Sequence, residues 1–81
     1  MASNLIPLRS LPPGRFALLV ELKGQRAFRR RLLELGLLPG TTVRLLRRSD
    51  VHNLVEIVVR GCHLSLRHSE AGQILVDLQD E

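Results

Sequence analysis

The fold of this chain depends on one stretch, RRRLLELGLLPGTTV at residues 29–43. Its first part has the spacing of a helix, and Gly36 lies where that helix should end. A glycine just past the last turn can adopt the left-handed conformation, which lets the final carbonyl groups find hydrogen-bond partners. Such a cap commonly brings the next apolar residue, here Leu37, back against Leu32. The stretch therefore predicts the end of a helix and a reversal of the chain.

The same stretch continues into a tight turn and a strand. Pro39 fixes one backbone angle and Gly40 can supply a positive one, which is typical of a β-turn. An extended run begins at Thr42. A second tight turn or bulge is predicted at Gly61, between two β-rich runs. We therefore expect four residues to have structural roles at these reversals: Gly36, Pro39, Gly40 and Gly61.

Short apolar runs and turn residues alternate along the rest of the chain. Strands are predicted over 15–23, 42–48, 54–60, 62–67 and 74–78, with a short helix after the first and one helical turn at 68–73. Five such strands cannot bury both faces of an open sheet, whereas a closed or nearly closed barrel removes the exposed edges. The prediction is a mainly β fold: a small SH3-like barrel of about five strands, with an α-helix inserted after the first strand and one helical turn before the last. It forms a single domain over 8–78, between a loosely ordered 1–7 and a frayed 79–81.

The predicted core is aliphatic, with one helix stripe and the inward faces of the strands. The chain has two phenylalanines and no tyrosine or tryptophan. Both parities of the first strand are apolar, so periodicity does not decide which faces inward. The residues expected in the core are Phe16, Phe28, Leu32, Leu35, Val43, Leu45, Val55, Ile57, Val59, Cys62, Leu64 and Leu66, with Leu8 and Leu11 over one end.

Composition and charge narrow the classes of function. The net charge is +4, and all but one of the twelve basic residues are arginine. Such a surface favours acidic partners, phosphate or an anionic membrane. A single cysteine excludes an internal disulfide and suits a reducing compartment. The longest apolar run, at 16–20, has five residues, far short of a membrane span or a signal-peptide core. These features indicate a soluble cytoplasmic module.

No catalytic site and no cofactor are predicted, and the metal-ligand pattern is sparse. No Ser, His and acid set, paired carboxylates or Gly-rich phosphate loop has the required spacing. The candidate metal ligands are His63, His68 and Cys62, with His52 as a fourth, since imidazole and thiolate bind transition metals. Cys62 and His63 are adjacent in a strand and point to opposite faces. His63 and His68 would supply only two ligands, so we expect at most weak transition-metal binding.

The arginines allow two kinds of binding surface. Four lie on the helix, at 26 and 29–31, and three lie across the corner at 44, 47 and 48. They could meet phosphates, but the absence of exposed aromatic residues disfavours nucleic acid. Leu33 falls among the outward arginines, and this mixture suits a protein interface. A solvated face is the alternative, and the residue pattern leaves both open. The partner-binding residues of the docking hypothesis are Arg26, Arg29, Arg30 and Leu33.

Three segments together resemble a known family. They are LRSLPPG at 8–14, RRLLELGLLPGTTV at 30–43, and VRGCHLSLR at 59–67 followed by EA at 70–71 and ILV at 74–76. In this order and at these distances they resemble the ferrous-iron transport protein A (FeoA) family, over about 8–78.

The resemblance implies a function as well as an SH3-like barrel. It implies a small cytoplasmic accessory or regulatory protein of bacterial ferrous-iron transport. Such a protein would bind the membrane transporter FeoB, whose cytoplasmic part includes a G-protein domain. The transporter would recruit it to the inner face of the membrane without insertion. Similar barrels occur at the C-terminus of diphtheria-toxin-repressor type metalloregulators. The alternative is therefore an SH3-like regulatory module that responds to nucleic acid or metal.

In one loop the sequence departs from this family. Members commonly have a glycine-aspartate-proline turn where this chain has Val51, His52, Asn53 and Leu54. The role of this loop and the oligomeric state are left open by the sequence, as is whether the protein activates, inhibits or scaffolds the transporter.

Overall fold

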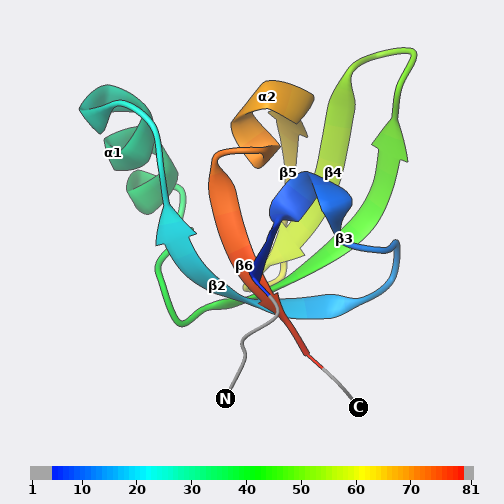
Figure 1. Cartoon of the computed structure of the whole chain (residues 1–81), viewed down its shortest axis with the longest axis horizontal. Helices are drawn as coiled ribbons and strands as arrows, with labels where there is room; N and C mark the ends of the chain where they lie inside the picture. Colours follow the sequence, from blue (N-terminus) through cyan, green and yellow to red (C-terminus); the bar gives the residue numbers. More distant parts are fainter. Residues whose placement is uncertain (1–4, 80–81) are drawn as a thin grey trace.

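Six antiparallel strands and three short helical segments make up residues 5–79, the part of the chain that the computed structural model describes (Figure 1). The strands lie side by side in the order β1-β6-β2-β3-β4-β5. The prediction of a mainly β fold is confirmed, and each of the five predicted strands is present. The elements in chain order are β1 (Leu5–Pro7), the 3-10 helix η1 (Leu8–Ser10), β2 (Phe16–Leu22), α1 (Arg26–Glu34), β3 (Thr42–Ser49), β4 (Leu54–Val59), β5 (Cys62–Arg67), α2 (His68–Ala71) and β6 (Ile74–Leu78).

Strand β1 and the 3-10 helix η1 were not predicted from the sequence. Residues 5–7 were expected to be loosely ordered, but they pair with β6, with Leu5 opposite Asp77. A run of three residues is too short to give a period-2 signal. Gln79 was expected to be frayed, yet its N–H donates to the Phe16 carbonyl at 3.2 Å. The predictions for 1–4 and 80–81 lie outside the described residues.

The sheet is strongly curved but stays open. Its register shifts between Leu19 and Glu21 on β2, and between Leu45 and Arg47 on β3. Each shift marks a bulge, and bulges bend a strand and increase its twist. The strands therefore curl around one core, as Figure 1 shows, while β1 and β5 remain its two edges. The predicted SH3-like barrel is thus formed by a curled sheet whose two edge strands are not paired with each other.

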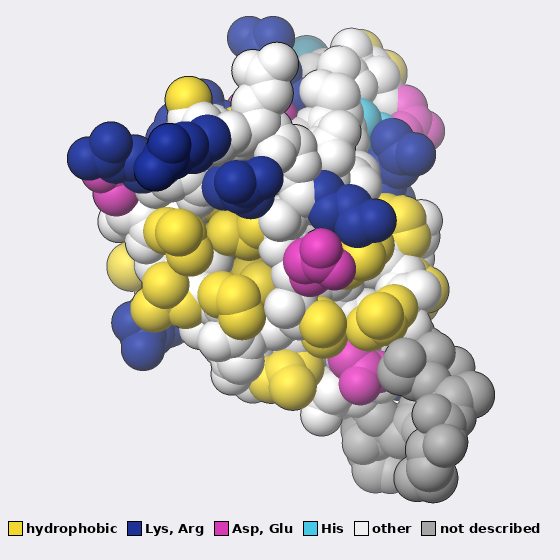
Figure 2. Space-filling model, turned by 60° about the vertical axis from the view of Figure 1, so that its left-hand side comes forward, with side chains coloured by type: hydrophobic (Ala, Val, Ile, Leu, Met, Phe, Trp, Pro, Cys, Tyr) yellow, Lys and Arg dark blue, Asp and Glu magenta, His cyan; other side chains and the backbone are white. Residues whose placement is uncertain are grey.

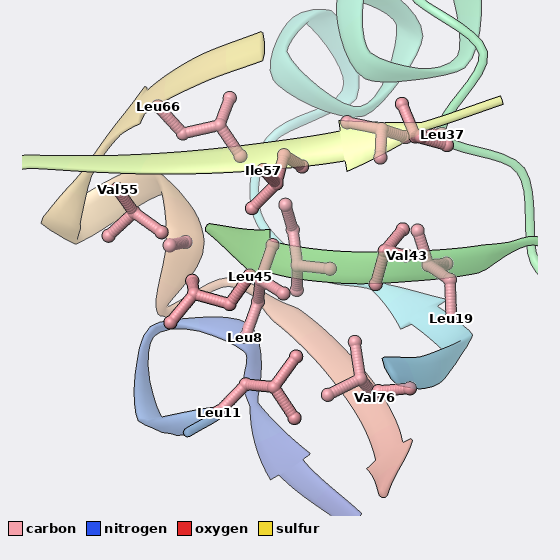
Figure 3. Packing of buried hydrophobic residues seen from close by; sticks show 14 of the residues in the cluster. Leu8, Leu11, Leu19, Leu37, Val43, Leu45, Val55, Ile57, Leu66 and Val76 are labelled. Carbon is pink, nitrogen blue, oxygen red and sulfur yellow. The ribbon is translucent and has the colours of Figure 1, made fainter. Parts of the chain in front are cut away.

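The core is aliphatic, as predicted, and among the described residues no polar or charged side chain is buried. Strands β2 to β6 and the helical segments η1, α1 and α2 contribute to it, and Figure 3 shows how the side chains converge. Residue Leu8 of η1 and the following Leu11 are both fully buried, which confirms their place at the core. The buried set is Leu8, Leu11, Ala17, Leu19, Leu32, Leu37, Val43, Leu45, Val55, Ile57, Val59, Leu66, Ala71, Ile74 and Val76.

Three residues expected in the core are exposed. Phe16 is 49% exposed because Ala17 and Leu19 lie on the face of β2 that points toward the core, and Phe16 lies on the opposite face. Leu35 is 45% exposed, since α1 ends at Glu34 and the next residue leaves the helical stripe. Cys62 is also exposed, because it begins the edge strand β5, which has a neighbour on one side only. The remaining expected residues are buried or, for Phe28 and Leu64, half-buried against the core.

The predicted helix-to-strand corner is confirmed in detail. Gly36 has φ +98°, and its N–H donates to the Leu33 carbonyl at 3.0 Å. The N–H of Leu37 donates to the Leu32 carbonyl, also at 3.0 Å. These two bonds form a Schellman cap, whose usual apolar contact joins the residues at the positions of Leu32 and Leu37; both are fully buried. Gly40 and Gly61 also have positive φ, at +92° and +78°.

Glu70 ties the two α-helices together. Its carboxylate accepts the N–H of Arg67 at 2.9 Å and pairs with the Arg31 guanidinium. The Arg67 N–H bond, and secondarily Arg31, hold the pKa of Glu70 below its ordinary value of 4.5, against a smaller opposing effect of burial. This carboxylate therefore stabilises the fold in its ionised form.

The Glu70 contacts predict a pH-dependent stability difference. A carboxyl group with a lowered pKa in the folded state stabilises above its unfolded pKa, and this contribution is lost as the pH falls through the folded pKa. Glu70→Gln is therefore expected to lower the unfolding midpoint at about pH 7, and the difference should disappear as the pH falls through the lowered pKa of folded Glu70. Thermal unfolding of both proteins across this range is the measurement. A difference that stays constant with pH would mean that packing, not charge, is lost.

Candidate docking face on helix α1

Helix α1 presents a basic outer face because its opposite side is fixed on the sheet. Leu32 is fully buried and Phe28 half-buried, so the rest of the nine-residue helix faces solvent. The predicted partner-binding residues are all exposed, and Leu33 is 41% exposed. We call these four residues the α1 face: Arg26, Arg29, Arg30 and Leu33.

Two of the three guanidinium groups of the α1 face are held only loosely. Arg30 lies 3.7 Å from Glu34, and both side chains are mostly exposed; such surface pairs contribute little to stability. Arg26 has no hydrogen bond or ion pair with any described residue. Arg29 instead donates to the Gly24 carbonyl at 2.7 Å. Arg26 and Arg30 can therefore turn to carboxylates on a partner at small cost.

Two other arginines of the expected basic surface, Arg47 and Arg48, hold the fold together. Arg47 donates to both carboxylate oxygens of Glu56, at 2.8 and 3.2 Å. Arg48 donates to the carbonyls of Leu11 and Arg9, at 2.6 and 3.1 Å, and so closes the loop before β2. The basic surface that the sequence suggested from the helix across to β3 is therefore interrupted at Arg47 and Arg48, and the α1 face is its available part on the helix.

Exposed leucines and a valine extend the α1 face around the corner. Leu35 and Leu38 are 45% and 38% exposed, and Val20 of β2 is 37% exposed. The hydrogen bond from the Gly40 N–H to the Leu19 carbonyl, at 2.7 Å, brings the corner beside β2. Figure 2 shows a row of basic side chains above a group of hydrophobic ones on this side of the molecule. We call Val20, Leu35 and Leu38 the corner patch.

The sequence pattern does not reveal the exposure of the corner patch, because this exposure depends on where the helix ends and on which face of β2 points inward. Leu35 fits the helical core stripe by spacing, and only the position of the cap removes it from that stripe. Val20 belongs to a strand with two apolar parities. The clearest available signal was Leu38, an apolar residue inside a turn, where burial is uncommon.

The candidate metal ligands do not converge. His63 lies near the start of β5 and His68 just past its end, and five residue steps along an extended chain span about 16 Å. Cys62 and His63 are both exposed on opposite sides of their strand. Among residues 5–79 no three His, Cys, Asp or Glu side chains are grouped as for a metal ion. The side chains of His68 and Asp50 approach to 3.7 Å.

The loop that departs from the family pattern supports α2. The carbonyl of Asn53 accepts the N–H of His68 at 3.2 Å, and the Asn53 N–H donates to the Asp50 carbonyl at 3.3 Å. The N–H of His52 donates to the Ser49 hydroxyl at 3.3 Å. At the tip, Val51 is 90% exposed. The loop therefore has a structural connection to the first turn of α2.

A family model described as the FeoA domain matches residues 6–78. This chain belongs to the FeoA domain family. The resemblance predicted from the three sequence segments is thereby confirmed. A curated relative from Porphyromonas gingivalis (strain ATCC BAA-308 / W83) is 31% identical over 71 residues and is described as "Fe(2+) transport protein A/Fe(2+) transporter FeoB fusion protein". The match covers 88% of this chain and 8% of that relative, and it links the FeoA family to ferrous-iron transport.

Solved structures confirm the SH3-like FeoA fold. The FeoA protein from Chlorobium tepidum is 32% identical, with a TM-score of 0.85 over 94% of this chain and 74% of that one. A manganese-dependent transcriptional repressor has a TM-score of 0.88 over 98% of this chain and 44% of its own, at 14% identity. At that identity the repressor shares the fold alone. Within residues 5–79 of this FeoA-family chain, no helix has the length and apolar character needed to span a bilayer.

Proposed function

We propose that this protein is a non-catalytic accessory of ferrous-iron transport that acts on the cytoplasmic side by binding the transporter FeoB. The observation that carries the proposal is the fusion relative, in which a segment 31% identical to this chain is part of one polypeptide with FeoB. Joining two modules raises their effective concentration for each other. The fusion therefore supports a functional association between the two modules.

The α1 face is the proposed contact. The guanidinium groups of Arg26 and Arg30 are loosely held, and Leu33 lies among the arginines with 41% of its surface exposed. Arginine and apolar anchors are common in the energetically important parts of interfaces. The matching surface on the transporter's soluble domain or cytoplasmic loops would present carboxylates around an apolar site.

The proposed action is binding without catalysis. Arginine and leucine side chains supply neither a nucleophile nor a general base near neutral pH. Binding would instead bias the assembly of the transporter or its nucleotide cycle. Recruitment to the inner face of the membrane would then come from the transporter and require no insertion of this chain.

A pull-down against the cytoplasmic part of FeoB tests the proposal. The test variant combines Arg26→Ala, Arg30→Ala and Leu33→Ala; all three side chains are exposed, so its melting temperature should stay near that of the wild type. We expect its binding to fall by about tenfold or more. The matched control removes two arginines and one apolar residue elsewhere on the surface, through Arg9→Ala, Arg67→Ala and Val51→Ala.

Two results would contradict parts of the proposal. Equal binding by the wild type and the α1 variant would mean that the α1 face is not the contact with FeoB. If the wild type and both variants all failed to bind, FeoB would not be the partner.

A second candidate function is an SH3-like regulatory module of a metal-dependent transcription system. The observation that favours it is the TM-score of 0.88 to the manganese-dependent repressor. Fluorescence anisotropy with duplex DNA separates the two candidates. Binding that discriminates between DNA sequences would support regulation, whereas binding that only falls with salt would report phosphate contact.

A further inference from the structure

A second surface lies on the outer side of the sheet, away from the α1 face. Phe16 of β2, Arg44 of β3 and Val58 of β4 form one cross-strand row. Phe16 is 49% exposed, and the Arg44 guanidinium lies over its ring, 5.6 Å from the centroid. Together with Arg60 these residues line an open hollow of about 440 Å³. We call it the Phe16 hollow; no residue of α1 or of the corner patch lines it.

Arg60 occupies a backbone position that disfavours it. Arg60 and Gly61 have φ of +53° and +78°, and they form the two-residue connection between β4 and β5. Two consecutive positive φ angles in such a hairpin indicate a type I′ turn, whose first position prefers asparagine, aspartate or glycine. The other non-glycine residue with positive φ within the described chain is Asn53, which follows this preference. Arg60 does not.

No hydrogen bond or ion pair of the Arg60 side chain within residues 5–79 offsets this strain, and the side chain is exposed. Strained backbone positions cluster at functional sites. The guanidinium of Arg60 is therefore a candidate for a contact outside the fold.

The chemistry of the hollow specifies its ligand. Arg44 and Arg60 place two positive charges at the rim, and no acidic residue lines the hollow. Phe16 and the half-buried Val58 supply an apolar floor. Because Arg44 already covers a face of the Phe16 ring, that face is closed to a stacked nucleotide base. Carboxylates on either side of an apolar side chain would complement this arrangement.

We propose that the Phe16 hollow binds an acidic peptide segment that carries an apolar anchor residue. The anchor would sit against Phe16 and Val58, and its flanking carboxylates would pair with Arg44 and Arg60. Guanidinium groups bind carboxylates with paired hydrogen bonds, which also orients the peptide. This binding surface is independent of the α1 face and of the proposed contact with FeoB.

Fluorescence anisotropy with labelled peptides tests this proposal. The probes have glutamates on both sides of a central leucine, phenylalanine or tryptophan, and the control peptides have lysines in the flanks. Arg60→Asn is the decisive variant, because asparagine suits the turn. We expect its melting temperature to rise by about 5 °C while its affinity for the acidic peptides falls by about fivefold or more. Phe16→Thr, which keeps a strand-forming residue, should also weaken binding. Arg9→Ala, at an exposed arginine that lines neither the hollow nor the α1 face, should leave binding unchanged.

Several outcomes would overturn the proposal. No binding of any acidic peptide by the wild type is one, and equal binding by Arg60→Asn is another. Equal binding of the lysine-flanked peptides would remove the charge argument. Preferential binding of a single-stranded oligonucleotide would assign the hollow to nucleic acid. Self-association that Phe16→Thr abolishes, measured by sedimentation equilibrium without any peptide binding, would assign it to a second copy of this chain.

Discussion

Replacing Leu32 with alanine is expected to lower the free energy of unfolding by about 3 to 5 kcal/mol. Leu32 is fully buried and fixes α1 on the sheet, and its carbonyl accepts the N–H of Leu37 in the helix cap. Truncation leaves a cavity between the helix and the sheet, where the fixed corner limits collapse. A domain of this size has a total stability of about 5 to 10 kcal/mol, so the variant should be close to unfolding.

The neighbouring Leu33 is the matched control. It is 41% exposed, so Leu33→Ala should change the free energy of unfolding by no more than about 0.5 kcal/mol. Urea denaturation of the two variants under the same conditions gives the comparison. Equal destabilisation by both would mean that Leu33 is a packing residue, which would remove it from the α1 face.

Gly36→Val is expected to cost about 2 to 3 kcal/mol. An ideal Cβ at this position would meet no atom within 4 Å, so steric crowding does not contribute. The cost comes from the backbone, because a β-branched residue strongly disfavours φ +98°. Moving away from this angle would break both capping hydrogen bonds. The expected signature is a lower midpoint of urea denaturation with an unchanged slope.

Gly36→Asn separates backbone strain from other effects. Asparagine tolerates the left-handed conformation better than other side chains, so its cost should be about 1 kcal/mol. The predicted order of stability is therefore wild type, asparagine, valine. If the valine variant unfolded at the wild-type midpoint, the left-handed cap would not be needed for stability.

The sequence predicted those parts of the fold that depend on local backbone chemistry. Gly36 and Gly40 act through their own φ angles, and their effect needs no knowledge of distant residues. Strands β3 and β4 alternate clearly, so Val43, Leu45 and Ile57 could be placed inward from their spacing alone. The resemblance to the FeoA family rested on the same corner, which explains why fold and family were identified together.

Other parts depend on contacts between distant segments. In β2 both parities are apolar, and only its pairing with β3 and β6 decides that Ala17 faces the core and Phe16 faces out. The bulge between Leu19 and Glu21 shifts the register where the sequence shows no Gly or Pro. Residues 5–7 form β1 because they pair with β6. No local signal marks these features.

At the candidate site, the availability of the charged side chains also depends on contacts between distant segments. Exposure of the α1 face followed from helical spacing, and the structure agrees. Which arginines are available did not follow, because the partners of Arg48 lie 37 and 39 positions away. Arg60 was assigned only to a turn, and its strain is visible only from the backbone angles. Availability of an arginine is thus a property of the folded chain.

The pairing of β1 with β6 determines how the domain would sit in a longer polypeptide. Leu5 lies opposite Asp77, so β1 starts and β6 ends at one pole of the molecule, whereas Leu22, from which the chain leads to α1, lies opposite Ile74 at the other end of β6. Figure 1 shows α1 at the far pole. A neighbouring domain joined at either end would therefore be tethered to the pole opposite α1. The basic helix would point away from such a junction and meet surfaces about a domain's width beyond it, with the domain measuring 32 × 28 × 22 Å.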